Sequence, residues 1–80
     1  MKLAHNGHDI EVRAIVLERG EWGVEGTIGW LDGAVENKKK FGLPYGIFSS
    51  QNDAETWGLL AAVRWIDAGK PDAEPFMTAH

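Results

Sequence analysis

Residues 50–69 read SQNDAETWGLLAAVRWIDAG, and this stretch predicts the one helix of the fold. Ser50 is a favourable N-cap, because its hydroxyl can accept a hydrogen bond from a free backbone N–H in the first turn. Asp53 stands where a capping box places its acidic residue, and its charge complements the positive end of the helix dipole. Gly69 supplies a C-terminal cap, and Pro71 prevents the helix from resuming.

The predicted helix has one apolar stripe. With the helical period of about 3.6 residues, small and aromatic side chains share one face. The stripe comprises Ala54, Trp57, Gly58, Ala61, Trp65 and Ala68, and is widened by Ala62 and Ile66. The small residues at its centre let the helix axis approach a sheet closely. On the opposite side Leu60 and Val63 are the only apolar residues, and we expect that side to face water.

Upstream of the helix, three segments predict β-strands. Residues 22–30 alternate most regularly, because apolar residues and one glycine fall on one face while polar residues and glycines fall on the other. Residues 8–18 show the same period of two between Ile10 and Val16. Residues 41–48 are apolar but interrupted by glycines and Pro44, so this third strand is irregular or lies at a sheet edge.

The connections between these segments carry turn signals. Asn6-Gly7 predicts a tight type I′ hairpin turn, with the short segment Lys2–His5 in front of it. Residues 19–21 form a second turn. Residues 31–40 are polar, begin with Asp32-Gly33, and are predicted as a mobile loop. Gly26 indicates a bulge or a close approach of the helix, and the alternative is a ligand lying on the glycine face.

Together these signals predict an α+β fold. A three-stranded antiparallel sheet in the order β-β-β-α packs against the C-terminal helix, with residues 1–69 as the domain and residues 70–80 as an extended, partly disordered tail. The chain has no cysteine to form a disulfide, so a core rich in aromatic residues must stabilise so small a domain. Its four tryptophans are Trp22, Trp30, Trp57 and Trp65.

The order of these motifs resembles a known pattern. The pieces are His5-Asn6-Gly7-His8, Gly20-Glu21-Trp22, Phe48-Ser49-Ser50 and residues 61–67 (AAVRWID). They resemble a group of small uncharacterised bacterial proteins whose β-β-β-α domain is similar to the double-stranded-RNA-binding fold. A weaker similarity is to the N-terminal domain of HicB-type antitoxins, whose Pro-x-Leu-Pro-Gly-Cys segment is missing here. The resemblance implies a fold and brings no catalytic residues with it.

Composition and motifs argue against several classes of function. The net charge of −4 disfavours a simple nucleic-acid coat, and no apolar run is long enough for a membrane span or a signal peptide, so we expect a cytoplasmic protein. His5 and His8 flank the first turn, but a metal site needs further ligands, so no metal is expected. The glycines at 20, 23, 26 and 29 do not stand between a strand and a helix, as a phosphate loop requires. Neither a cofactor nor an enzymatic activity is expected.

The remaining hypotheses concern binding. We expect a non-enzymatic protein-interaction module, which could bind another protein or a second copy of itself. Its candidate contact residues are Leu60, Val63, Phe76 and Met77. The alternative is weak nucleic-acid binding, with Lys38, Lys39 and Lys40 attracting phosphates and Tyr45 stacking on bases.

Overall fold

The computed structural model describes residues 1–71, and it describes residues 43–47 by their backbone alone. Four strands precede one long helix: β1 (Lys2–His5), β2 (His8–Val16), β3 (Trp22–Asp32) and β4 (Val35–Phe48), then α1 (Gln51–Asp67). A 3₁₀ turn, η1 (Glu18–Gly20), joins β2 to β3. The predicted tail falls almost wholly outside the described residues.

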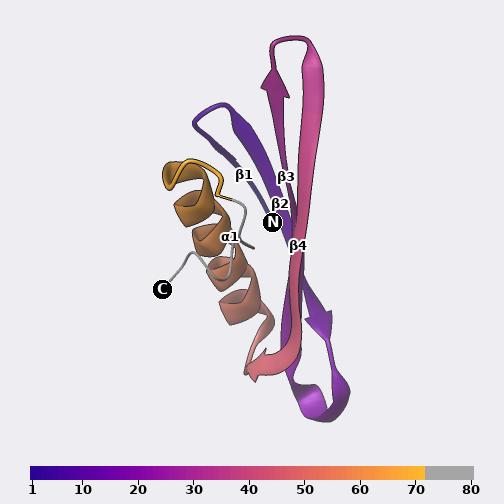
Figure 1. Cartoon of the computed structure of the whole chain (residues 1–80). Coiled ribbons are helices and arrows are strands. Elements are labelled where there is room, and N and C mark those ends of the chain that lie inside the picture. The colour runs from indigo at the N-terminus through magenta and orange to yellow at the C-terminus, as the bar shows by residue number, and fades with distance from the viewer. Residues whose placement is uncertain (72–80) are drawn as a thin grey trace.

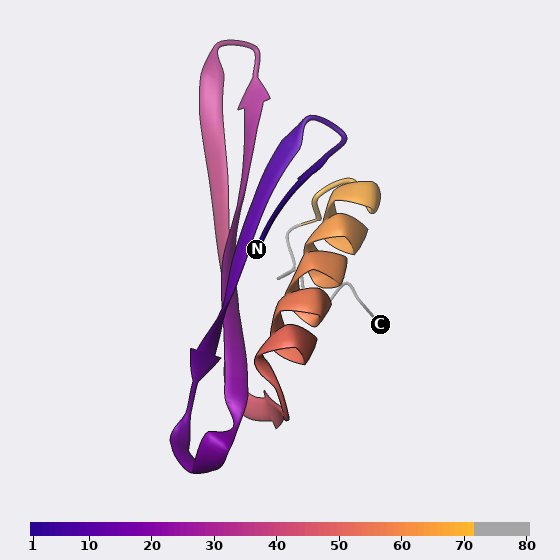
Figure 2. The ribbon, with the colours of Figure 1, turned by 180° about the vertical axis from the view of Figure 1, so that it is seen from behind.

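The strands form one antiparallel sheet in the order β1-β2-β3-β4, and α1 covers one of its faces (Figure 1). The opposite view shows the other face free of helices (Figure 2). The α+β class and the single helix are therefore confirmed. The predicted count of three strands is wrong, because the sheet has four.

The extra strand is the short segment before the first turn. Lys2 pairs with Glu11, and His5 pairs with His8. Between them Asn6 (φ 47°) and Gly7 (φ 75°) both have positive φ. A type I′ turn requires this conformation of its two central residues. Reciprocal backbone hydrogen bonds of 2.9 Å between Met1 and Val12 extend the pairing. The segment is too short to show a periodic pattern, so only the turn signal indicated it.

Residues 31–40 were expected to be a loop, and this expectation is wrong. They form a hairpin, with Asp32 paired to Val35 across a turn at Gly33 and Ala34. Of these two turn residues only Gly33 has positive φ (64°). A glycine at the first central position is typical of a type II′ turn. The end of this hairpin projects past α1 (Figures 1 and 2), so water meets both of its faces and no alternation of apolar residues is needed.

The ends of α1 follow the sequence prediction. The Asp53 backbone N–H donates to the Ser50 hydroxyl oxygen at 3.1 Å. At the other end the backbone N–H of Gly69 (φ 87°) donates to the Ile66 carbonyl oxygen, and the backbone N–H of Lys70 donates to the Trp65 carbonyl oxygen, both at 3.0 Å. This is the Schellman arrangement, in which the last carbonyls of a helix find partners.

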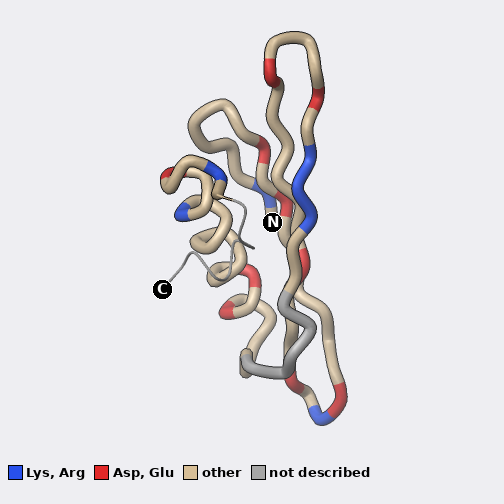
Figure 3. The backbone as a smooth tube through the Cα atoms, in the orientation of Figure 1, with Lys and Arg blue, Asp and Glu red and all other residues tan. Residues whose placement is uncertain are grey.

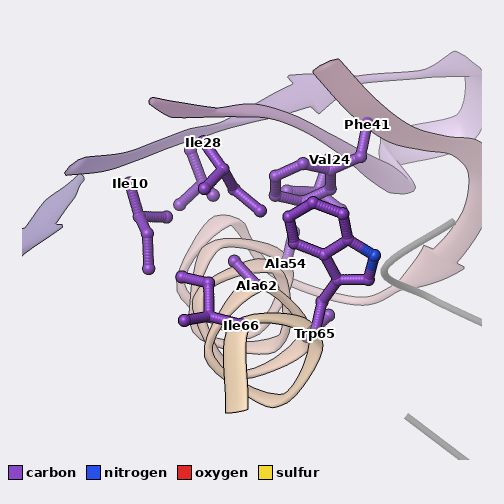
Figure 4. Packing of buried hydrophobic residues seen from close by; sticks show 10 residues of the cluster. Ile10, Val24, Ile28, Phe41, Ala54, Ala62, Trp65 and Ile66 are labelled. Atoms are coloured by element: carbon purple, nitrogen blue, oxygen red, sulfur yellow. The ribbon is translucent and has the colours of Figure 1, made fainter. Parts of the chain in front are cut away.

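The core lies between α1 and the sheet, as Figure 4 shows. Its buried residues are Ile10, Val12, Val24, Ile28, Phe41, Ala54, Ala61, Ala62, Trp65 and Ile66. The predicted stripe is confirmed except at Trp57, which is half-buried, and at Ala68, which is exposed beyond the last helical residue.

Two glycines make the close packing possible. A Cβ on Gly58 of α1 would lie 2.8 Å from Val24 Cγ2, so the helix approaches the sheet most closely there. A Cβ on Gly26 would lie 2.6 Å from Phe41 Cζ, so the space above Gly26 holds a ring from the neighbouring strand. The group that lies close over Gly26 is therefore the Phe41 ring, where the helix was the expected neighbour. The helix approaches the sheet closely at Gly58.

Candidate functional site

The outer side of β4 is a free edge of the sheet among the described residues. Among the described residues β4 pairs with β3 alone, so it forms one edge of the sheet. The other edge strand, β1, has only four residues. The register of β4 is regular from Val35 to Leu43 and shifts only opposite Trp22 and Val24. This confirms that the third predicted strand is both irregular and at an edge. We call residues 35–42 the edge segment.

The direction of each backbone group in the edge segment follows from the hairpin turn. The residues flanking a two-residue turn exchange both N–H···O bonds, and hydrogen-bonded pairs then alternate along the ladder. The backbone groups of Val35, Asn37, Lys39 and Phe41 therefore point to β3. Those of Glu36, Lys38 and Lys40 point outward, where an added strand could bind them.

The lysine run is divided between the two faces of the sheet. Lys39 pairs with Ile28, whose side chain belongs to the core on the helix side. Since side chains alternate along a strand, Lys38 and Lys40 lie on the open face. Figure 3 shows the run in the middle of the projecting hairpin. The expected cluster of three adjacent lysines is therefore a pair on one face and a single residue on the other.

The cations of the open face differ in their partners. Lys2 pairs with Glu11 (3.4 Å), and Arg13 pairs with Glu25 opposite it on β3. Lys38 faces Gly29 and Lys40 faces Thr27, neither of which has a charge. Among residues 1–71 neither of these lysines forms an ion pair. The edge of the sheet thus presents two lysines that have no ion-pair partner among the described residues.

The open face is hollowed where its side chains are small. A shallow depression of about 940 Å³ lies over Thr27 and Gly29, bordered by Lys2 and Lys38. Its charged side chains of both signs are exposed, and no buried side-chain polar atom within residues 1–71 lacks a partner.

The two histidines stand opposite each other, as their places beside the turn predicted, but they have different partners. His5 Nε2 donates to Asp67 Oδ1 at 2.8 Å, and Asn6 Nδ2 donates to the same oxygen at 3.3 Å. His8 Nδ1 donates to the Asn6 carbonyl at 2.7 Å, and Lys70 Nζ donates to His8 Nε2 at 3.1 Å. Because an ammonium only donates and a carbonyl only accepts, these partners fix the His8 tautomer.

These bonds fasten the β1–β2 turn to the end of α1. Lys70 Nζ also lies 4.7 Å from the centre of the Trp30 ring, and Trp30 in turn contacts Trp65 with a centroid distance of 6.0 Å. No group of three or more metal-ligating side chains occurs in the described part of the chain. The arrangement is a structural clasp, which we call the histidine clasp (His5, His8, Asp67 and Lys70).

The other predicted contact residues are scattered or undescribed. Leu60 is 49% exposed, whereas Val63 is half-buried at the margin of the core. A single exposed leucine is ordinary on a protein surface. Phe76 and Met77 lie outside the described residues, and so does the side chain of Tyr45.

Sequence reasoning missed the hairpin tip and with it two exposed apolar residues. Leu31 is 70% exposed and Val35 is 62% exposed, on either side of the turn. Asp32-Gly33 was the available signal, since Asp-Gly is among the strongest hairpin markers.

Comparisons of the chain with protein-family models, with curated proteins and with solved structures find no match. In residues 1–71 the helix is neither long enough nor apolar enough to span a bilayer.

Proposed function

We propose that the chain is a non-enzymatic protein-interaction module that binds an extended segment of a partner along the edge segment of β4. The observation that carries the proposal is the row of outward backbone groups at Glu36, Lys38 and Lys40, which have no neighbouring strand within residues 1–71. Adding a strand to a sheet edge is a common mode of peptide recognition, because main-chain hydrogen bonds supply affinity and alternate side chains supply specificity.

The shape of the molecule supports the proposal. The hairpin of β3 and β4 projects beyond the helix (Figure 1), so a partner can reach the edge segment without displacing α1. Leu31 and Val35 at the tip are among the most exposed large apolar residues of the described chain, and they lie on opposite faces of the hairpin, so each face offers a partner one apolar side chain. A second copy of the chain is one partner that would fit this description.

Two variants test whether the edge accepts a strand. Lys38→Thr/Lys40→Thr removes the positive charges and keeps every backbone donor. Lys38→Pro/Lys40→Thr removes the same charges and also the outward N–H of residue 38, while the hydrogen bonds to β3 remain. Lysines on an edge strand suppress edge-to-edge pairing, so we expect the first variant to self-associate with rising concentration and the second to stay monomeric.

Light scattering over a series of concentrations provides the measurement, with the wild-type chain alongside. Self-association of the wild type that the proline variant abolishes would identify a second copy as the partner. Equal masses for the two variants at every concentration would contradict strand addition at this edge.

Nucleic-acid binding through Lys38, Lys39 and Lys40 is the alternative, and it has less support. Lys38 and Lys40 share the open face with carboxylates from β2, β3 and β4, and phosphate binding favours an uninterrupted basic surface. We also keep as a proposal the resemblance to small bacterial proteins with a β-β-β-α domain. That resemblance does not suggest an activity for this chain.

A further inference from the structure

We infer that the segment bound along β4 is an acidic strand, with carboxylates at alternate positions opposite Lys38 and Lys40. The inference rests on the proposed function and adds the chemistry of the partner. In an antiparallel arrangement the partner would read acid-x-acid-x-base from its N-terminus, with the basic residue opposite Glu36.

In the edge segment the outward backbone groups and the open-face side chains belong to the same residues. The residues whose backbone groups point outward, namely 36, 38 and 40, are also those whose side chains lie on the open face. An added strand would place its directly opposite residues on that same face, with Cβ atoms about 4.5–5.5 Å away. Each charge on the edge therefore meets one particular position of the partner.

The cations of the open face differ in whether they form ion pairs. Lys2 and Arg13 each pair with a carboxylate on a neighbouring strand, so cross-strand ion pairs already occur on the open face. Lys38 and Lys40 have only Gly29 and Thr27 on their inner side, and their outer side is free among residues 1–71. A fifth strand carrying carboxylates would continue the pairing that the sheet already uses.

A second copy of the chain complements this edge less well. If two copies of β4 pair antiparallel with Lys38 on the symmetry axis, Glu36 of each copy meets Lys40 of the other, but the two Lys38 ammonium groups meet each other. If Asn37 lies on the axis, Glu36 meets Lys38 favourably, but Lys40 then faces the turn residue Ala34. An acidic strand satisfies both lysines at once, and it is therefore the occupant that the charges favour.

Two synthetic peptides with opposite charge patterns test the inference on the full chain. The acidic peptide is acetyl-Thr-Glu-Val-Glu-Val-Lys-Thr-amide, and the basic peptide is acetyl-Thr-Lys-Val-Lys-Val-Glu-Thr-amide. Since the peptides differ in the sign of the cross-strand charge pairs, we expect the acidic peptide to bind about tenfold more tightly. Amide chemical shifts should change along residues 35–42, and the preference should shrink as salt screens the charges.

Charge-swapped variants provide the control. Lys38→Glu/Lys40→Glu should reverse the preference, and the milder Lys38→Gln/Lys40→Gln should reduce it to what the charge pair with Glu36 alone contributes. The matched control is Lys2→Glu/Arg19→Glu, which changes the net charge equally at two exposed positions away from β4 and should leave the preference intact. Circular dichroism of each variant verifies that the fold is retained.

Three outcomes would overturn the inference. Equal binding of both peptides would remove the charge selectivity, while the proline test above would still decide strand addition separately. Equal binding of an acidic peptide with methylated backbone nitrogens would indicate loose attraction without strand pairing. Tighter binding of a single-stranded oligonucleotide, lost in Lys38→Glu/Lys40→Glu, would favour nucleic acid instead.

Discussion

Gly26 and Gly29 lie in the same strand but differ in the space around them. A Cβ on Gly26 would stand 2.8 Å from the Glu11 carbonyl oxygen and still closer to the Phe41 ring, whereas a Cβ on Gly29 meets nothing nearer than 3.8 Å. We expect Gly26→Ala to lower the free energy of unfolding by about 1–3 kcal/mol, the usual cost of overpacking. Gly29→Ala, its matched control, should be neutral or slightly stabilising in chemical denaturation.

Trp65 and Trp57 also differ in what their removal should cost. Trp65 is 3% exposed and its Nε1 donates to the Pro71 carbonyl oxygen at 3.1 Å, while Trp57 is half-buried against Phe48. Trp65→Ala should lower the free energy of unfolding by about 3–5 kcal/mol, and Trp57→Ala by clearly less. Urea titrations that gave equal losses would show that the margin of the core is as tightly packed as its centre.

At the scale of elements, the tip of the β3–β4 hairpin depends on one turn residue. Gly33 has a positive φ of 64°. A residue with a side chain is less stable in that left-handed conformation by roughly 1–2 kcal/mol. Gly33→Ala should therefore loosen Asp32 and Val35, whose backbone groups pair across the turn, without lowering global stability, because neither residue belongs to the core. The amides of these residues should exchange hydrogen faster in Gly33→Ala than in the wild type. Ala34→Ser, a control at a turn position of negative φ, should leave their exchange rates unchanged.

The elements that the sequence predicted well are those whose residues face the core. The helix has caps at both ends and a stripe defined by burial, so local and tertiary signals agreed. The prediction of a loop over residues 31–40 failed because a hairpin that is exposed to water on both faces shows no apolar alternation. Only the turn signal Asp32-Gly33 could have indicated this hairpin. The candidate site was predicted in part: Pro44 and the neighbouring glycines indicated an edge strand over residues 41–48. That residues 35–42 belong to the same free edge could not be predicted, since it depends on which strands pair.

At the scale of the whole molecule, the histidine clasp joins segments from the two ends of the chain. Lys70 reaches both His8 and the Trp30 ring, so it links α1 to β2 and β3. Lys70→Met should lower the free energy of unfolding by about 1 kcal/mol through the lost cation–π contact and hydrogen bond. Lys2→Met, which removes one exposed ion pair, should change it by less than about 0.5 kcal/mol in the same thermal denaturation series.

The contact between Trp30 and Trp65 gives the molecule an optical property of its own. Two indole rings with centroids 6.0 Å apart and planes inclined by 58° are close enough for their electronic transitions to couple. The far-ultraviolet circular dichroism should therefore contain an exciton couplet that is absent from Trp30→Phe and from Trp65→Phe. Because one ring comes from the sheet and the other from the helix, the amplitude of that couplet would report, in any titration, whether the helix still rests on the sheet.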